Sequence, residues 1–229
     1  MYKFGTNYGG WYLPKNINLN ENSIIYSGGV GEDISFDILL QSKFNSNIFL
    51  IDPTYKSIKH FDECKKFFND KSFKFTGNIQ KDYYSHIMNE NFNFEKVFYI
   101  NKGLWNKKDK LKFYKQHNEN YVSQSLIEGM FSNNFEIIDV VSIKDIMNQY
   151  GHSHIDLLKL DIEGAEIVVL EQMIKDNIFP KYLCIEFDLL LKRKDKNNLT
   201  KELINLLINI GYKILCDDKL NITFEFNNL

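Results

Sequence analysis

The last third of the chain alternates short apolar runs with longer segments of helical spacing, and this alternation constrains the fold more than any other feature. Residues 155–161 and 182–187 are apolar runs of strand length, and a helical segment, residues 163–175, lies between them. Residues 199–210 then carry a regular apolar stripe that ends at Gly211, as helices often do. A strand–helix–strand order is typical of parallel strands joined by crossover helices.

The chain ends in a different pattern, because two apolar runs, residues 212–216 and 222–226, are separated only by a short polar turn. Such a pair predicts an antiparallel hairpin. Together with the runs earlier in the chain, we predict an α/β fold with a doubly wound, mostly parallel seven-stranded sheet, helices on both faces and an antiparallel terminal hairpin. The strands are expected to begin near residues 23, 47, 73 or 96, 155, 181, 212 and 222.

The length of 229 residues predicts one domain, residues 1–229. Residues 1–22 are rich in glycine, asparagine and aromatic residues, and we expect an irregular arm. Residues 111–114 have the pattern of an edge strand, and residues 115–134 are expected to be a loop or an insertion on the substrate side.

Composition excludes several classes of protein. The 28 basic and 30 acidic residues give a net charge of −2, and a nucleic-acid binder needs a basic face. Arg193 is the only arginine, so bidentate arginine clamps on phosphate are scarce. The three cysteines are far apart, which excludes a disulfide framework, and no apolar run is long enough to span a membrane. We therefore expect a cytoplasmic protein with a small-molecule substrate and no nucleic-acid partner; its oligomeric state is left open.

A glycine turn follows the first predicted strand and precedes the first helix. Such a turn lets a ligand approach the backbone, although a plain tight turn explains it equally well. Two acids in the turn would repel a pyrophosphate, which disfavours a dinucleotide and suits a ligand with a cationic centre. The candidate cofactor-binding residues here are Gly28, Gly29, Val30, Gly31, Glu32 and Asp33.

Asp52 ends the second predicted strand, 23 residues after Gly29. A carboxylate at this position can accept both hydroxyls of an adenosine ribose. The alternative is a helix-capping role before Pro53.

Carboxylates end two further strands that we expect to be neighbours. Asp161 and Glu163 follow one strand, and Glu186 ends the next, with Asp188 close by. Such a pair could act as a general base and its partner, or Asp161 and Glu186 could hold a hard divalent cation such as Mg²⁺ or Mn²⁺. Lys159 has apolar neighbours and is expected to pair with one of these acids. The candidate catalytic residues are therefore Lys159, Asp161, Glu163 and Glu186.

The run Ile-Asp-Leu-Leu-Lys-Leu-Asp-Ile-Glu-Gly-Ala-Glu at residues 155–166 closely resembles the signature of the FkbM-type methyltransferase family. Residues 26–37, 51–54 and 103–106, together with residues 111–114, resemble one branch of that family. The resemblance implies a Rossmann-like fold and S-adenosylmethionine-dependent O-methylation, often of sugars.

By this resemblance, Ser27 to Asp33 form the loop at the methionine end of the cofactor, and Asp52 is the ribose ligand. The turn formed by Asn101, Gly103 and Leu104 lies near the adenine or the methyl donor. Ser27 stands where the family usually has an acid, and Asp33 where it has a third glycine.

The leading hypothesis is therefore an O-methyltransferase that acts on a sugar or sugar nucleotide of a bacterial surface polysaccharide. A base or a bound metal would remove the proton of the acceptor hydroxyl. The alternatives are a nicotinamide-dependent oxidoreductase and a non-catalytic partner subunit.

Overall fold

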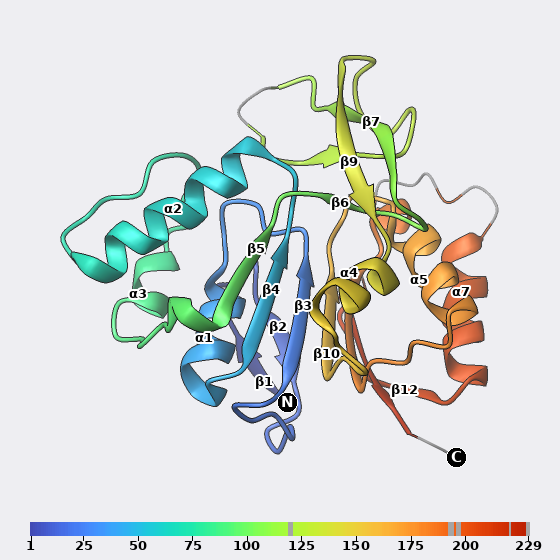
Figure 1. The fold of residues 1–229 in the computed structure, drawn as a ribbon, viewed down its shortest axis with the longest axis horizontal. Coiled ribbons are helices and arrows are strands. Elements are labelled where there is room, and N and C mark those ends of the chain that lie inside the picture. Colours follow the sequence, from blue (N-terminus) through green and yellow to red (C-terminus); the bar gives the residue numbers. More distant parts are fainter. Residues whose placement is uncertain (119–120, 192–194, 196–197, 220, 228–229) are drawn as a thin grey trace.

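A seven-stranded sheet forms the centre of the computed structural model, which describes residues 1–118, 121–191, 195, 198–219 and 221–227. Figure 1 shows this sheet with helices on either side and a second, smaller sheet above it. The strand order is β12-β13-β11-β10-β3-β4-β5. The bounds are Ile24–Gly28 (β3), Asn47–Ile51 (β4), Val97–Ile100 (β5), Leu157–Leu160 (β10), Tyr182–Glu186 (β11), Tyr212–Asp217 (β12) and Asn221–Phe226 (β13).

The direction of the strands confirms the predicted fold class. Strands β5, β4, β3, β10 and β11 pair in parallel, while β13 is antiparallel to both β11 and β12. The carboxyl ends of β3, β4 and β10 therefore lie at one edge, where open α/β sheets bind their ligands.

Alternate side chains of each strand enter two separate cores. On β4, Phe49 and Ile51 join one core, and Ile48 and Leu50 join the other, as the two-residue period of a strand requires. Helices α4 (Ile143–Tyr150), α5 (Glu166–Lys175) and α7 (Leu199–Asn209) contribute to the first core. Helices α1 (Ser35–Phe44), α2 (Tyr55–Asn69) and α3 (Tyr83–Ile87) contribute to the second. A further short helix, α6, spans Asp188–Leu191, and a 3-10 turn spans Phe94–Lys96.

The third strand of the sheet is residues 97–100, so the alternative start near residue 73 is wrong. Phe73 and Phe75 instead pack in a cluster of aromatic rings with Phe67 and Tyr84. The backbone N–H of Phe75 donates to the hydroxyl of Tyr84 (2.9 Å), so a side chain takes the place of a neighbouring strand.

A four-stranded sheet lies beyond the carboxyl ends of the main strands, at the top of Figure 1. Its order is β6-β9-β7-β8, with bounds Gly103–Leu104 (β6), Asp109–Lys115 (β7), Gln124–Ser125 (β8) and Phe135–Val141 (β9). The strand predicted at residues 111–114 exists, but it belongs to this sheet and pairs with β9. Between residues 116 and 134, most of the residues that the structure describes lie outside helices and strands, apart from β8.

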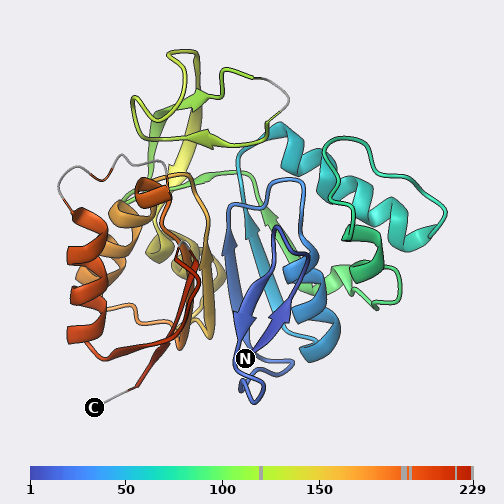
Figure 2. The ribbon, with the colours of Figure 1, turned by 180° about the vertical axis from the view of Figure 1, so that it is seen from behind.

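The N-terminal arm is more regular than predicted, because β1 (Tyr2–Phe4) and β2 (Trp11–Leu13) pair as an antiparallel hairpin. Figure 2, the view from behind, shows this hairpin against the sheet. Phe4, Trp11 and Leu13 are buried in the second core. The hairpin loop therefore projects from a fixed base.

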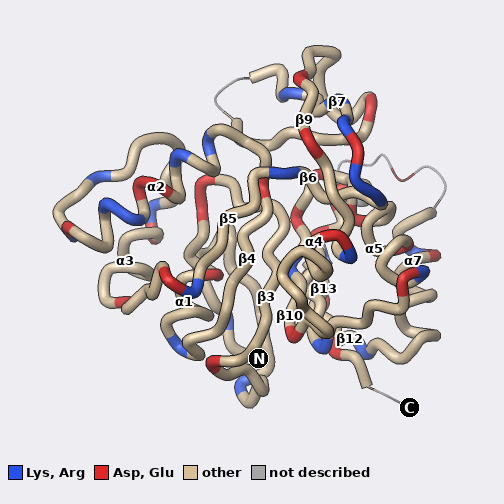
Figure 3. The backbone as a smooth tube through the Cα atoms, in the orientation of Figure 1, with Lys and Arg blue, Asp and Glu red and all other residues tan. Residues whose placement is uncertain are grey.

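Charged residues of both signs are interspersed along the chain (Figure 3). None of the helices in the described part of the chain combines the length and apolar character that a membrane crossing needs.

Candidate functional site

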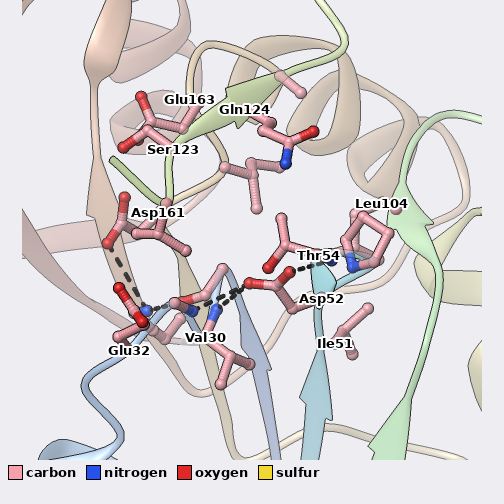
Figure 4. Close-up of a pocket in the computed structure, with 18 of the residues that line it drawn as sticks. Val30, Glu32, Ile51, Asp52, Thr54, Leu104, Ser123, Gln124, Asp161 and Glu163 are labelled. Carbon is pink, nitrogen blue, oxygen red and sulfur yellow. Dashed lines mark hydrogen bonds and ion pairs between the residues drawn. The ribbon is translucent and has the colours of Figure 1, made fainter. Parts of the chain in front are cut away.

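A pocket opens at the carboxyl ends of β3, β4 and β10, beneath the smaller sheet. Figure 4 shows the side chains of Val30, Asp52, Leu104, Gln124 and Asp161 around it. The lining residues are Tyr8, Gly9, Gly29, Val30, Gly31, Glu32, Asp33, Ile51, Asp52, Pro53, Thr54, Gly103, Leu104, Phe113, Val122, Ser123, Gln124, Leu126, Lys159, Asp161, Ile162, Glu163 and Ala165.

The glycine loop reaches the pocket because it passes very close to β10. Gly29 has a φ of +78°, and a Cβ there would overlap the carbonyl oxygen of Asp161. The carbonyl of Gly29 accepts a hydrogen bond from Nζ of Lys159. Glycine is thus required at this position by the approach of two strand ends.

Asp52 is buried at the end of β4 and holds the glycine loop in place. One carboxylate oxygen accepts from the backbone N–H groups of Val30 (2.8 Å) and Gly31 (3.0 Å), and the other accepts from Thr54 (2.7 Å) (Figure 4). Helix α2 itself is capped by Thr54, whose hydroxyl accepts from the N–H of Ser57. Asp52 therefore lines the pocket and joins β4 to the glycine loop, and its role as a ribose ligand stays a prediction.

The turn after β10 is held by a buried glutamate. Glu166 Oε1 accepts from the N–H groups of Ile162 (2.8 Å) and Gly164 (3.2 Å), while Glu163 and Gly164 both have positive φ. Burial raises the pKa of Glu166 well above its usual value, and Asp188 adds to the rise. This turn presents Glu163 to the pocket.

Three carboxylates gather beside the pocket, as the sequence predicted. Asp161, Glu186 and Asp188 each have a carboxylate oxygen within 4.8 Å of the other two. Burial, and then the charges of Asp161 and Asp188, raise the pKa of Glu186 from 4.5 to about 8. Glu186 is therefore mostly protonated at pH 7, and Asp161 is the member of the cluster that lines the pocket.

Lys159 is buried between these acids and the glycine loop. Its Nζ lies 3.7 Å from a carboxylate oxygen of Asp161, in addition to its bond to Gly29. The buried Asp37 of α1 has a pKa raised to about 6 by burial, and the charge of Lys159 opposes the rise. Lys159 thus pairs with Asp161, as expected, and holds the glycine loop through its hydrogen bond to Gly29.

Two segments outside the predicted cofactor-binding and catalytic residues also line the pocket. Tyr8 and Gly9 come from the N-terminal hairpin, and Phe113 comes from β7 of the smaller sheet. Partial burial of its hydroxyl and the charges of Asp161 and other acids raise the pKa of Tyr8 to about 12, so the group stays neutral at pH 7. These contacts arise from tertiary packing and carry no local sequence signal.

Not every predicted cofactor-binding residue reaches the pocket. Ser27 and Gly28 are buried behind its wall, and Asn101 is exposed outside the described lining. Gly29 to Asp33, Asp52, Gly103 and Leu104 do line it, as do the predicted catalytic residues Lys159, Asp161 and Glu163. Glu186 lies next to Asp161, but it is not among the described residues that line the pocket.

Comparison with known proteins identifies the family that the sequence matches. Residues 13–214 match the family described as the methyltransferase FkbM domain. Among solved structures, the fibrillarin pre-rRNA processing protein of Methanococcus jannaschii aligns with a TM-score of 0.44 and 11% identity, over 92% of this chain and 69% of that chain. No curated protein matches the sequence.

Proposed function

Because the chain belongs to the methyltransferase FkbM domain family, we propose that it is an S-adenosylmethionine-dependent O-methyltransferase whose acceptor is a sugar or sugar nucleotide. We further propose that it acts in the cytoplasm, in the synthesis of a bacterial surface polysaccharide. The three cysteines are free thiols, which is usual in a reducing compartment.

The charge of the pocket is the observation that carries this proposal. Five carboxylates line it, and the one ammonium, Lys159, is already paired with Asp161. The carboxylates belong to Glu32, Asp33, Asp52, Asp161 and Glu163. A ligand with sulfonium and ammonium groups fits this excess of negative charge, whereas the pyrophosphate of a nicotinamide dinucleotide would be repelled.

The lining residues divide into parts that suit the parts of the cofactor. The acids at the glycine loop would hold the methionine end, and Asp52 would accept from the ribose hydroxyls. Leu104 and Phe113 offer apolar surface for the adenine ring of the cofactor. When bound, the cofactor supplies an electrophilic methyl group.

Asp161 is the residue that we propose as the general base. It lines the pocket, and the Nζ of Lys159 lies 3.7 Å from one of its carboxylate oxygens. The cofactor would supply the methyl group, and Asp161 would take up the proton that the acceptor hydroxyl loses. Lys159 holds the glycine loop and orients Asp161, while the protonated Glu186 limits the negative charge beside it.

A divalent cation is the alternative to this metal-free mechanism. The oxygens of Asp161, Glu186 and Asp188 are close enough to share Mg²⁺ or Mn²⁺, which would displace the proton from Glu186 and lower the pKa of a bound hydroxyl. Methyl transfer that survives prolonged EDTA treatment eliminates the metal. Transfer that is lost and then restored by Mn²⁺ or Mg²⁺ establishes it.

Calorimetric titration with S-adenosylhomocysteine and with NADH separates the candidate functions. We expect S-adenosylhomocysteine to bind and NADH not to bind. Binding of NADH alone would support the oxidoreductase, and binding of neither ligand would support a non-catalytic subunit.

A further inference from the structure

A second hollow adjoins the pocket and shares part of its wall. Tyr8, Glu32, Asp33, Val122 and Ser123 line both spaces. The hollow is completed by Asn78, Gln80, Asn118 and Tyr121. If the pocket holds the cofactor, as proposed above, a second ligand can reach the cofactor through this adjoining space.

Two exposed aromatic rings face this hollow. Tyr8 is 67% exposed and Tyr121 is 62% exposed, and among the described aromatic residues only Tyr55, at 76%, is more exposed. Large aromatic surfaces are costly to leave in water, and the C–H face of a sugar ring can cover them while its hydroxyls stay solvated.

Tyr8 is held in place by the loop that carries it. The N–H of Thr6 donates to the hydroxyl of Ser35 (2.8 Å), and the Thr6 hydroxyl donates to Asp33 (2.5 Å). The N–H of Asn7 donates to Asp82 (2.9 Å). The loop is therefore hydrogen-bonded to the rest of the fold through the two residues that precede Tyr8.

The segment that carries Tyr121 is also tied to the fold. The carbonyl of Tyr121 accepts a hydrogen bond from Lys56 of α2 (3.2 Å). Three side-chain amides, those of Asn78, Gln80 and Asn118, contribute to the lining. An amide offers donors and acceptors together, which matches a sugar hydroxyl that does both.

The charge of the two spaces limits what can enter. The described lining of the hollow contains no lysine or arginine, and it includes the acids Glu32 and Asp33. In the pocket, Lys159 is buried and already paired. Lys56, whose ammonium bonds the carbonyl of Tyr121, is a cation beside the hollow, but a diphosphate inside it would meet two carboxylates and no lysine or arginine of the described lining.

We propose that this hollow is the acceptor subsite, and that it takes a sugar without phosphate, either neutral or bearing an amine, stacked between Tyr8 and Tyr121. The inference rests on the proposed methyltransferase function and narrows its acceptor to the glycan itself, excluding a nucleotide-activated sugar.

Saturation-transfer NMR on the protein loaded with S-adenosylhomocysteine tests this assignment. The probes are methyl glycosides of glucose, galactose, mannose, rhamnose and glucosamine, each beside its nucleoside diphosphate counterpart. We expect a saturation-transfer signal for at least one methyl glycoside. The signal of its nucleoside diphosphate counterpart should be at least fivefold weaker. Equal or greater transfer to the diphosphate form, or transfer to no methyl glycoside, overturns the proposal.

Two tyrosine variants locate the binding. Tyr121→Ala should abolish the saturation-transfer signal of the methyl glycoside. Its affinity for S-adenosylhomocysteine, measured by calorimetry, should stay within twofold of that of the unchanged protein. Tyr55→Ala removes a more exposed tyrosine outside both spaces and should leave the transfer unchanged. Equal saturation-transfer signals with Tyr121→Ala and Tyr55→Ala would refute the assignment of the subsite. A protein that binds no S-adenosylhomocysteine would instead refute the methyltransferase function.

Discussion

Replacing Glu186 by glutamine should stabilise the protein at neutral pH, because the native fold buries this carboxyl beside two other acids. Its pKa rises from 4.5 to about 8 on folding. Between pH 4.5 and pH 7 the unfolded chain releases the proton and the folded chain keeps it, so stability falls by about 1.4 kcal/mol per pH unit. At pH 7 the accumulated cost is about 3 kcal/mol, and Glu186→Gln removes it.

Urea denaturation at pH 5, 6 and 7, followed by tryptophan fluorescence, measures this effect. The gain in unfolding free energy for Glu186→Gln should grow with pH over this range. Glu171→Gln, which changes an exposed acid of α5, should shift stability by less than about 0.5 kcal/mol at every pH. A gain that does not depend on pH, or a loss of stability at pH 7, would show that folding does not raise the pKa of Glu186, and would refute the reasoning.

Three further substitutions test other parts of the site. Asp52→Ala should weaken S-adenosylhomocysteine binding by about 1–3 kcal/mol in calorimetry, and no loss would leave Asp52 with only its backbone contacts. Glu166→Ala should lower the unfolding free energy in urea by about 2–4 kcal/mol, because two backbone N–H groups lose their acceptor, whereas Glu166→Gln keeps an acceptor oxygen and should cost less. Asp161→Asn should slow methyl transfer by about 10²–10⁴-fold, and unchanged turnover would remove it as the base.

Local sequence patterns were sufficient for the central sheet. Apolar runs of strand length and helical stripes identified β3, β4, β10 and β11 and the terminal hairpin, because buried parallel strands read as continuous apolar segments. They left the third strand ambiguous, since the aromatic residues near position 73 are as apolar as those of β5. In the native fold, side-chain packing of Phe75 with Tyr84 decides the matter.

The smaller sheet could not be predicted in the same way. Its strand β9, residues 135–141, holds five apolar residues, but Glu136 and Asp139 interrupt them and most of its side chains are exposed, so the strand does not show the continuous apolar run of a core strand. It forms through pairing with β7, more than twenty residues earlier in the chain. The contribution of this sheet to the pocket therefore depends on long-range contacts.

The acids at the strand ends and the glycine loop were predicted, whereas individual residues of the other loops were not. Asp161 and Glu186 could be placed together because neighbouring parallel strands bring their carboxyl ends to one edge. Glu166 is buried, and its carboxylate accepts hydrogen bonds from the turn before its helix, which its position in the sequence does not reveal. Tyr8 comes from a hairpin whose position depends on the packing of Phe4 and Trp11.

The most direct test of the proposed function is the chemical form of the methyl group after transfer. The protein would be incubated with S-adenosylmethionine labelled in the methyl group and with sugars from the panel above, and the labelled product would be treated with alkali. We predict label that resists alkali, as a methyl ether does, on a sugar without an amine, and about 10²–10⁴-fold slower labelling with Asp161→Asn. Label released as methanol would reveal an ester on a carboxyl group of the protein itself, and no label on any sugar would contradict sugar O-methylation.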